Sequence, residues 1–164
     1  MTSCVFPGSF DPVTVGHLDL IRRASERFDL VTVTVMINIR KKGNIEPEER
    51  VRLLRKACAG LQNVRVDSWD GLLSRYMLEK NETIILRGVR TAGEFEAERE
   101  AALVNRLLAP GADTWLVPAS EGLSCVSSSM VRELAAFGGD IRRFVPEGLA
   151  EEILEALSNQ EREA

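Results

Sequence analysis

The sequence predicts an α/β fold built on a parallel sheet of five strands. Five short runs of β-branched and apolar residues recur along the chain, and their near-continuous apolar character is typical of strands buried on both faces of a parallel sheet. Segments with helical spacing separate these runs, and strands that alternate with helices form βαβ units with right-handed crossovers. The expected architecture is therefore a Rossmann-like, doubly wound sheet with helices on both faces. A chain of 164 residues has the size of one domain, residues 1–164.

The predicted strands lie in five segments, which in chain order are Cys4 to Phe6, Val31 to Ile37, Val64 to Val66, Thr83 to Leu86 and Thr114 to Val117. Helices are predicted where apolar residues recur at spacings of three and four. The three apolar stripes are Leu18, Ile21, Ala24 and Phe28; then Val51, Leu54 and Cys58; and then Ala97, Ala101, Val104 and Leu108.

The ends of several helices are also marked in the sequence. Pro47, followed by two glutamates, suits the first turn of the second helix. The Gly138-Gly139-Asp140 segment should end a helix over Met130 to Phe137. A final helix is predicted over Leu149 to Leu157, and the polar tail after it, residues 158–164, should fray.

Composition excludes several classes of protein. The chain has 21 basic and 25 acidic residues and a net charge of -4, so a basic surface for nucleic acid is not expected. No apolar run approaches the roughly 18 residues of a membrane span, and the start MTSCVF lacks the features of a signal peptide. The three cysteines, Cys4, Cys58 and Cys125, are too far apart for Cys-x-x-Cys spacing, and their odd number argues against a disulfide framework. We therefore expect a cytoplasmic protein with reduced thiols and no membrane association.

The loop after the first strand is the first candidate site. Ligands of doubly wound folds bind beyond the carboxyl ends of the strands. This loop, PGSFDPVTVGH from Pro7 to His17, contains glycines that bring the backbone close to a ligand, and a helix begins near His17, where free N–H groups suit an anion. His17 is the single histidine of the chain, and at a helix N-terminus it can donate a hydrogen bond to that anion.

Three more loops carry unusual residues. The second strand is followed by a basic loop, Ile39 to Ile45, in which Lys41 and Lys42 are adjacent. The fourth strand leads into Arg87-Gly88-Val89-Arg90, where the glycine should let the chain turn while both guanidinium groups face one cavity and contact phosphate. The fifth strand is followed by Ser127 to Ser129 at a helix start, which predicts an anion-binding cluster of hydroxyl and N–H groups. On the helix after Arg90, Glu98 and Asn105 share a face that can border the cleft.

Together these motifs resemble those of the nucleotidyltransferase superfamily with a Thr/His-x-Gly-His signature. The form Pro-Gly-Ser-Phe-Asp-Pro followed by Thr-x-Gly-His is similar to the bacterial phosphopantetheine adenylyltransferase family. Arg87 to Arg90, the Glu94-Phe95-Glu96-Ala97-Glu98 block, and Val126 to Arg132 match the remaining motifs of that family in order. The resemblance covers about Val5 to Pro146. Relatives usually have proline in place of Ile39 and an aromatic residue in place of Ile45, so the register of the basic loop is open between Lys41 and Lys42.

The resemblance implies a reaction in which ATP and 4'-phosphopantetheine give dephospho-coenzyme A and pyrophosphate by direct in-line attack. It implies catalytic roles for His17, Lys41 and Ser9. The implied ATP contacts are Ser9, Phe10, Gly16, His17, Arg90, Glu98, Ser127, Ser128 and Ser129. The implied phosphopantetheine contacts are Ser9, Lys41, Leu72, Leu73, Arg87 and Asn105. Mg²⁺ is expected on the triphosphate, with no dedicated protein metal site, and by analogy with relatives the assembly is a homohexamer that coenzyme A can inhibit.

Two alternatives stay open at this point. A sister nucleotidyltransferase would act on nicotinamide mononucleotide or on a small phosphorylated alcohol, although Thr14 in place of histidine argues against it. In a different class, the chain would be a catalytically inactive nucleotide-binding module on the same fold. The presence of His17 and Lys41 argues against that second alternative.

Overall fold

The computed structural model describes residues 1–38, 40 and 42–163, with side chains up to residue 159. Eleven helices and strands alternate along this part of the chain. The strands are β1 (Ser3–Gly8), β2 (Leu30–Met36), β3 (Val64–Trp69), β4 (Ile84–Val89) and β5 (Asp113–Pro118). The helices are α1 (Val15–Ser25), α2 (Pro47–Ala57), α3 (Leu73–Lys80), α4 (Ala92–Leu108), α5 (Ser128–Ala136) and α6 (Ala150–Glu163).

The five strands form one parallel sheet in the order β3-β2-β1-β4-β5. All four neighbouring pairs are parallel, and β1 pairs with β2 from Ser3 opposite Leu30 to Gly8 opposite Val35. The strand order reverses direction between β1 and β4, which is the topological switch point of a doubly wound sheet. The predicted Rossmann-like architecture is therefore confirmed, and the carboxyl ends of β1 and β4 are where a ligand is expected.

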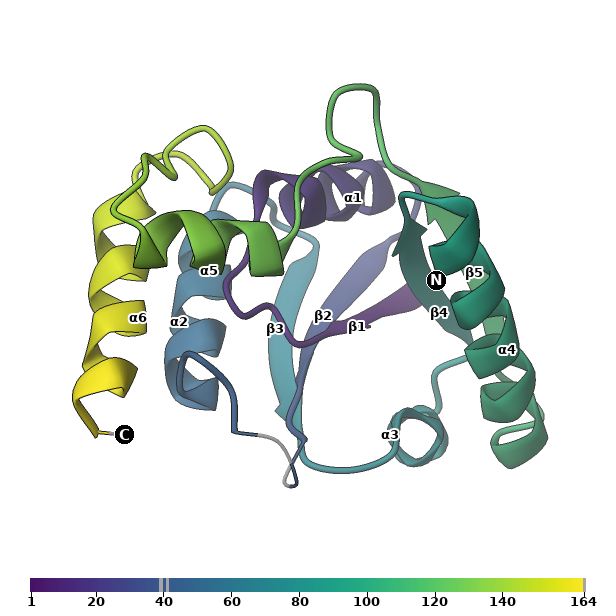
Figure 1. Cartoon of the computed structure of the whole chain (residues 1–164). Coiled ribbons are helices and arrows are strands. Elements are labelled where there is room, and N and C mark those ends of the chain that lie inside the picture. Colours follow the sequence, from purple (N-terminus) through teal and green to yellow (C-terminus); the bar gives the residue numbers. More distant parts are fainter. Residues whose placement is uncertain (39, 41, 164) are drawn as a thin grey trace.

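Helices cover both faces of the sheet (Figure 1). Most buried apolar residues form one core between the sheet and α1, α2, α5 and α6, with Ile21, Leu54, Val131 and Ile153 completely buried. A smaller core on the other face joins Val5 and Ile85 of the sheet to Tyr76 and Met77 of α3. In Figure 1, α5 and α6 lie beside α2, while α4 runs along the β4–β5 side of the sheet. The site between β1 and β4 is thus bordered by α1, α4 and α5.

Helix α3 was missed by the sequence prediction. Its Tyr76 and Met77 are buried against the sheet, so an apolar pattern was present, but eight residues give a weak periodic signal. The end of α5 was predicted well: the helix ends at Ala136, and Gly138 adopts a φ of 72°, a left-handed conformation that glycine allows. Helix α6 runs on to Glu163, through most of the segment that was expected to fray.

The predicted core stripe of α4 is wrong in this structure. No residue of α4 is buried, and Val104 and Leu108 are 53% and 51% exposed. The helix packs beside β4 and β5 at the border of the sheet, so little of its surface is covered. Its apolar residues, including Leu103 and Leu107, are left facing outward on a surface of α4 that the rest of the described chain does not cover.

Candidate active site

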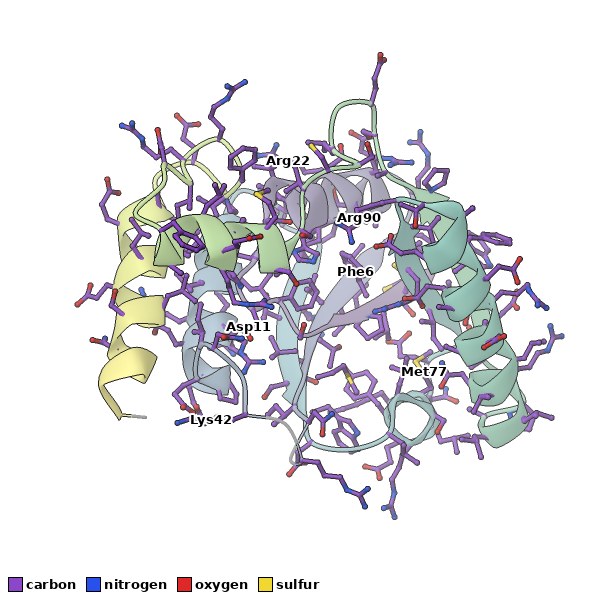
Figure 2. All side chains as sticks on the ribbon, in the orientation of Figure 1. Phe6, Asp11, Arg22, Lys42, Met77 and Arg90 are labelled. Carbon is purple, nitrogen blue, oxygen red and sulfur yellow. The ribbon has the colours of Figure 1, made fainter. Side chains whose placement is uncertain are left out.

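A cavity of about 870 Å³ opens at the carboxyl ends of β1 and β4, within the range of small-molecule sites. Among the predicted site residues that the structure describes, those that line it are Ser9, Phe10, Gly16, His17, Arg87, Arg90, Glu98, Ser127, Ser128 and Ser129. Figure 2 shows Phe6 and Arg90 between α1 and α4 at this cavity, and Asp11 beside α2. Together with Lys42 and Asn44 of the basic loop, residues from four segments that are far apart in the sequence therefore meet at one site.

Thr14 and His17 explain the start of α1. Thr14 is the N-cap, and its side chain accepts a hydrogen bond from the backbone N–H of His17 at 3.3 Å. In return, the backbone N–H of Thr14 donates to Nδ1 of His17 at 3.0 Å. This reciprocal arrangement is a capping box in which histidine takes the place of the usual glutamate. Because a backbone N–H can only donate, Nδ1 is unprotonated, and neutral His17 carries its proton on Nε2.

The surroundings of His17 keep the imidazole neutral. Burial, together with the nearby charges of Arg87 and Arg90, lowers the pKa of His17 to about 4. Phe10 packs edge-on against the imidazole with the ring centroids 4.9 Å apart, and Phe6 packs edge-on against Phe10. Phe10 is almost completely buried at a φ of 47°. Its ring therefore packs against Phe6 and His17 and is almost inaccessible to a ligand.

Arg87 and Arg90 are both paired with carboxylates of α4. Arg87 binds Glu98 through two hydrogen bonds of 2.8 and 2.5 Å and also donates to the carbonyl of Pro7 at 2.5 Å. Arg90 contacts both carboxylate oxygens of Glu94 and donates to the carbonyl of Val126 at 2.9 Å. In this structure the two arginines thus bind carboxylates of the protein itself, where the sequence predicted contacts with phosphate. Glu94 is a site residue that the sequence prediction missed.

Gly88 has a different role from the one expected. It lies inside β4 rather than in a tight turn. A Cβ at this position would stand 2.3 Å from Cδ1 of Leu20, so glycine lets the Leu20 side chain of α1 pack directly on β4. Gly16 is the opposite case, because a Cβ there would meet only Oγ1 of Thr14 at an ordinary 3.5 Å. The protein does not itself fill the space at Gly16, which agrees with the close ligand approach predicted there.

The three serines at the start of α5 are each engaged in the structure. Ser127 is the N-cap and accepts from the N–H of Met130 at 3.1 Å. The hydroxyl of Ser128 donates to the carbonyl of Pro12 at 2.7 Å, and the hydroxyl of Ser129 accepts from Arg132 at 3.2 Å. The first N–H groups of a helix have no partner within the helix, so the N-terminus of α5 offers backbone donors to an anion in the cavity.

The basic loop reaches the same cavity. Arg40, Lys42 and Asn44 line it, while Lys41, the predicted catalytic lysine, and Ile39 lie outside the described residues. Ile45, which replaces an aromatic residue of the relatives, is 1% exposed and belongs to the main core.

Three predicted phosphopantetheine contacts do not lie in the cavity. Leu72, Leu73 and Asn105 are absent from its lining. Leu72 is the N-cap of α3 and 66% exposed, and Leu73 packs against the smaller core. A contact with these three residues would therefore need a ligand that extends out of the cavity.

The charges of the lining favour an anionic ligand. Among the described lining residues there are six arginines and lysines and four carboxylates, although the whole chain is acidic. No group of three or more His, Cys, Asp or Glu side chains in the described part could hold a metal ion. None of the described helices is long and apolar enough to cross a membrane.

Several known proteins are similar to this chain in sequence. Residues 5–134 match the cytidylyltransferase-like family. The chain is 44% identical to the phosphopantetheine adenylyltransferase of Clostridium perfringens over 155 residues, which cover 94% of each chain. It is 43% identical to the phosphopantetheine adenylyltransferase of Rubrobacter xylanophilus over 161 residues, 98% of each chain.

A solved structure of low sequence identity has the same fold. The nicotinic acid mononucleotide adenylyltransferase of Plasmodium falciparum, complexed with NaAD, superimposes with a TM-score of 0.66 at 14% identity over 97% of each chain. At this identity the likeness concerns the fold alone, whereas the bacterial relatives match in sequence over nearly the full length of both chains. The chain therefore belongs to the phosphopantetheine adenylyltransferases, a family of cytidylyltransferase-like nucleotidyltransferases.

Proposed function

We propose that this protein transfers AMP from ATP to 4'-phosphopantetheine, giving dephospho-coenzyme A and pyrophosphate. The observation that carries the proposal is His17, whose Nδ1 is occupied by the backbone of Thr14 so that a neutral Nε2–H remains for a ligand. It lines the cavity together with Arg87 and Arg90. A fixed donor near two guanidinium groups suits a phosphate on which negative charge increases during a reaction.

The proposed mechanism needs no protein nucleophile. A phosphate oxygen of phosphopantetheine attacks the α-phosphate of ATP in line, and pyrophosphate leaves. His17 donates to the α-phosphate in the transition state. Ser9 and Lys41 orient the attacking phosphate and reduce its repulsion from ATP, with Lys42, which lines the cavity, as the alternative to Lys41. The protein thus contributes position and charge rather than covalent chemistry.

The remaining groups bind the two substrates. Arg90 and the N-terminus of α5, from Ser127 to Ser129, hold the β- and γ-phosphates. Arg87 binds the phosphate of phosphopantetheine. Glu98 contacts ATP, and the open space at Gly16 lets ATP approach the backbone. Outside the cavity, the pantetheine arm passes along Leu72, Leu73 and Asn105.

Mg²⁺ is part of the proposal as an ion bound to the triphosphate. The described residues provide no cluster that could hold a metal, which fits an ion carried into the site by phosphate and water oxygens. Its chemistry would be to neutralise charge on the triphosphate. The carboxylates Glu94 and Glu98 are already engaged by arginines, so the chain's own contribution is the cationic side of the site.

Assembly, control and location extend the proposal. By analogy with relatives we propose a homohexamer. Helix α4 exposes Leu103, Val104, Leu107 and Leu108, an apolar surface that a second subunit can cover. Coenzyme A contains the skeleton of the product and would compete in the same cavity. The free thiols of the chain agree with a reducing, cytoplasmic location.

Pyrophosphate release from ATP tests the function. It should be measured separately with 4'-phosphopantetheine, nicotinamide mononucleotide and glycerol 3-phosphate as acceptors. Release with phosphopantetheine alone is expected. Release with either other acceptor would identify a sister transferase, and ATP binding without release with any acceptor would identify an inactive nucleotide-binding module.

A further inference from the structure

We propose that Asp11 is a positioning residue whose carboxylate holds the Lys42–Ile45 segment against the Ser9–Pro12 loop. The inference rests on the proposed function, because it assigns Asp11 the task of placing the basic loop for attack by the acceptor phosphate. Figure 2 shows Asp11 beside α2, and Lys42 lower on the loop that leads into this helix. The two residues lie 31 positions apart in the sequence, so contacts across space must connect them.

The carboxylate of Asp11 contacts the basic loop through one oxygen and faces Arg50 of α2 with the other. Asp11 is 6% exposed, and its Oδ2 accepts two hydrogen bonds from Asn44, one from the backbone N–H at 2.8 Å and one from Nδ2 at 2.9 Å. Its Oδ1 is buried without a hydrogen-bond partner and stands 3.7 Å from Nε of Arg50. Asn44 comes two residues after Lys42, so this contact anchors the loop close to its cavity-lining cation.

Arg50 of α2 also links the basic loop to the Ser9–Pro12 loop. It is 6% exposed, donates from Nε to the carbonyl of Ile45 at 2.6 Å, and donates from Nη1 to the carbonyl of Ser9 at 3.4 Å. A Cβ on Gly43 would stand 1.7 Å from its Nη2, so the loop lies directly on the guanidinium group. A buried charge needs a partner, and Asp11 is the carboxylate that the structure pairs with Arg50.

The backbone of the Asp11 loop is held from another side. Arg132 of α5 donates to the carbonyl of Asp11 at 2.7 Å, and Ser128 donates to the carbonyl of Pro12 at 2.7 Å. Backbone contacts therefore fix this loop to α5, and the Asp11 side chain fixes the basic loop to it. Replacing the side chain should release the basic loop and leave the contacts to α5, where the triphosphate is proposed to bind, intact.

The test compares Asp11→Asn with the wild-type protein and with Asp140→Asn, which removes a carboxylate from an exposed pair with Arg142. For Asp11→Asn we expect kcat to fall about 10²-fold, as a misplaced catalytic loop can cause, while Kd for ATP from titration calorimetry changes by less than about threefold. Asp140→Asn should leave both values unchanged. Asn44→Ala removes the Nδ2 donor and keeps the backbone N–H, so kcat should fall in this variant by a smaller factor than in Asp11→Asn. This second variant keeps the inference testable if Asp11→Asn does not fold.

Two further measurements separate positioning from stability and from the reaction itself. The double variant Asp11→Asn/Arg50→Gln removes both buried charges, so its thermal stability should recover relative to Asp11→Asn while kcat stays low. Amide hydrogen exchange of residues 42–46 without substrates should be faster in Asp11→Asn than in the wild type. Wild-type kcat in Asp11→Asn, an equal loss of ATP affinity and kcat, or unchanged exchange at residues 42–46 would each overturn the inference. Absence of pyrophosphate release by the wild-type protein would instead reject the proposed function.

Discussion

The single histidine of the chain makes the protonation of the active site directly measurable. His17 accepts from the N–H of Thr14 at Nδ1, and burial together with Arg87 and Arg90 lowers its pKa from 6.5 to about 4. We therefore expect the imidazole to be neutral, with its proton on Nε2, at all pH values above about 5. In protein labelled with ¹⁵N-histidine, one pair of ring signals should report this tautomer and should titrate near pH 4.

The same pKa predicts how stability changes with pH. The unfolded chain protonates His17 near pH 6.5, whereas the folded chain resists protonation until about pH 4. Between these pH values the unfolded state binds more protons than the folded state. Protonation of the unfolded chain therefore does not reduce the free energy of unfolding above pH 6.5, and it reduces this free energy progressively as the pH falls from 6.5 toward 4. Each pKa unit corresponds to about 1.4 kcal/mol, so the loss amounts to about 3 kcal/mol.

A variant without the titrating group isolates this effect. In His17→Asn, the free energy of unfolding measured with urea should lose about 3 kcal/mol less than the wild type between pH 7 and pH 4. The same variant should lower kcat by roughly 10²- to 10³-fold at pH 7 while changing ATP affinity little, because the donor acts mainly in the transition state. A histidine signal that titrates near 6.5, a proton on Nδ1, or parallel stability curves for the two proteins would refute this account of His17.

Three more predictions concern the groups around His17. Arg90→Ala should weaken ATP binding more than phosphopantetheine binding, and Arg87→Ala should do the reverse; equal effects in calorimetry would mean that the two arginines act as one clamp. Lys41→Ala should reduce turnover by orders of magnitude and Lys42→Ala by less than about tenfold, and the opposite ranking would assign the role to Lys42. Gly16→Ala should leave thermal stability unchanged, because a Cβ there meets only Thr14 at 3.5 Å, but should raise KM for ATP at least several-fold; an unchanged KM would show that ATP does not approach Gly16.

The sequence predicted the sheet and the main site because both depend on local patterns. Uninterrupted apolar runs identified all five strands, with ends displaced by at most three residues from those observed. His17, Arg90 and the three serines follow strand ends, Arg87 lies near the end of β4, and parallel strands bring such positions to one edge. The motif order was thus sufficient to group these residues without any contact information.

Other features depend on contacts that a pattern does not show. The apolar residues of α4 have helical spacing whether they face a core or a partner, so periodicity could not reveal that Val104 and Leu108 are exposed. Gly88 is required by the side chain of Leu20, 68 residues away in the sequence. Asn44 and Arg50 are polar residues near a loop, and only the buried carboxylate of Asp11 distinguishes them from solvated side chains.

The pairing of the arginines with glutamates accounts for a cationic site in an acidic protein. Two guanidinium groups beside a neutral histidine would repel each other without counter-charges, and Glu94 and Glu98 supply these charges from one helix, α4. Each carboxylate holds its arginine in a two-pronged geometry that a phosphate can also adopt. Each arginine also donates to a backbone carbonyl, Pro7 for Arg87 and Val126 for Arg90, which holds it on the protein independently of its glutamate. Under the proposed function, a phosphate that took the place of a carboxylate on either guanidinium group would leave that glutamate without its arginine, so the carboxylate and the phosphate compete for the same N–H groups.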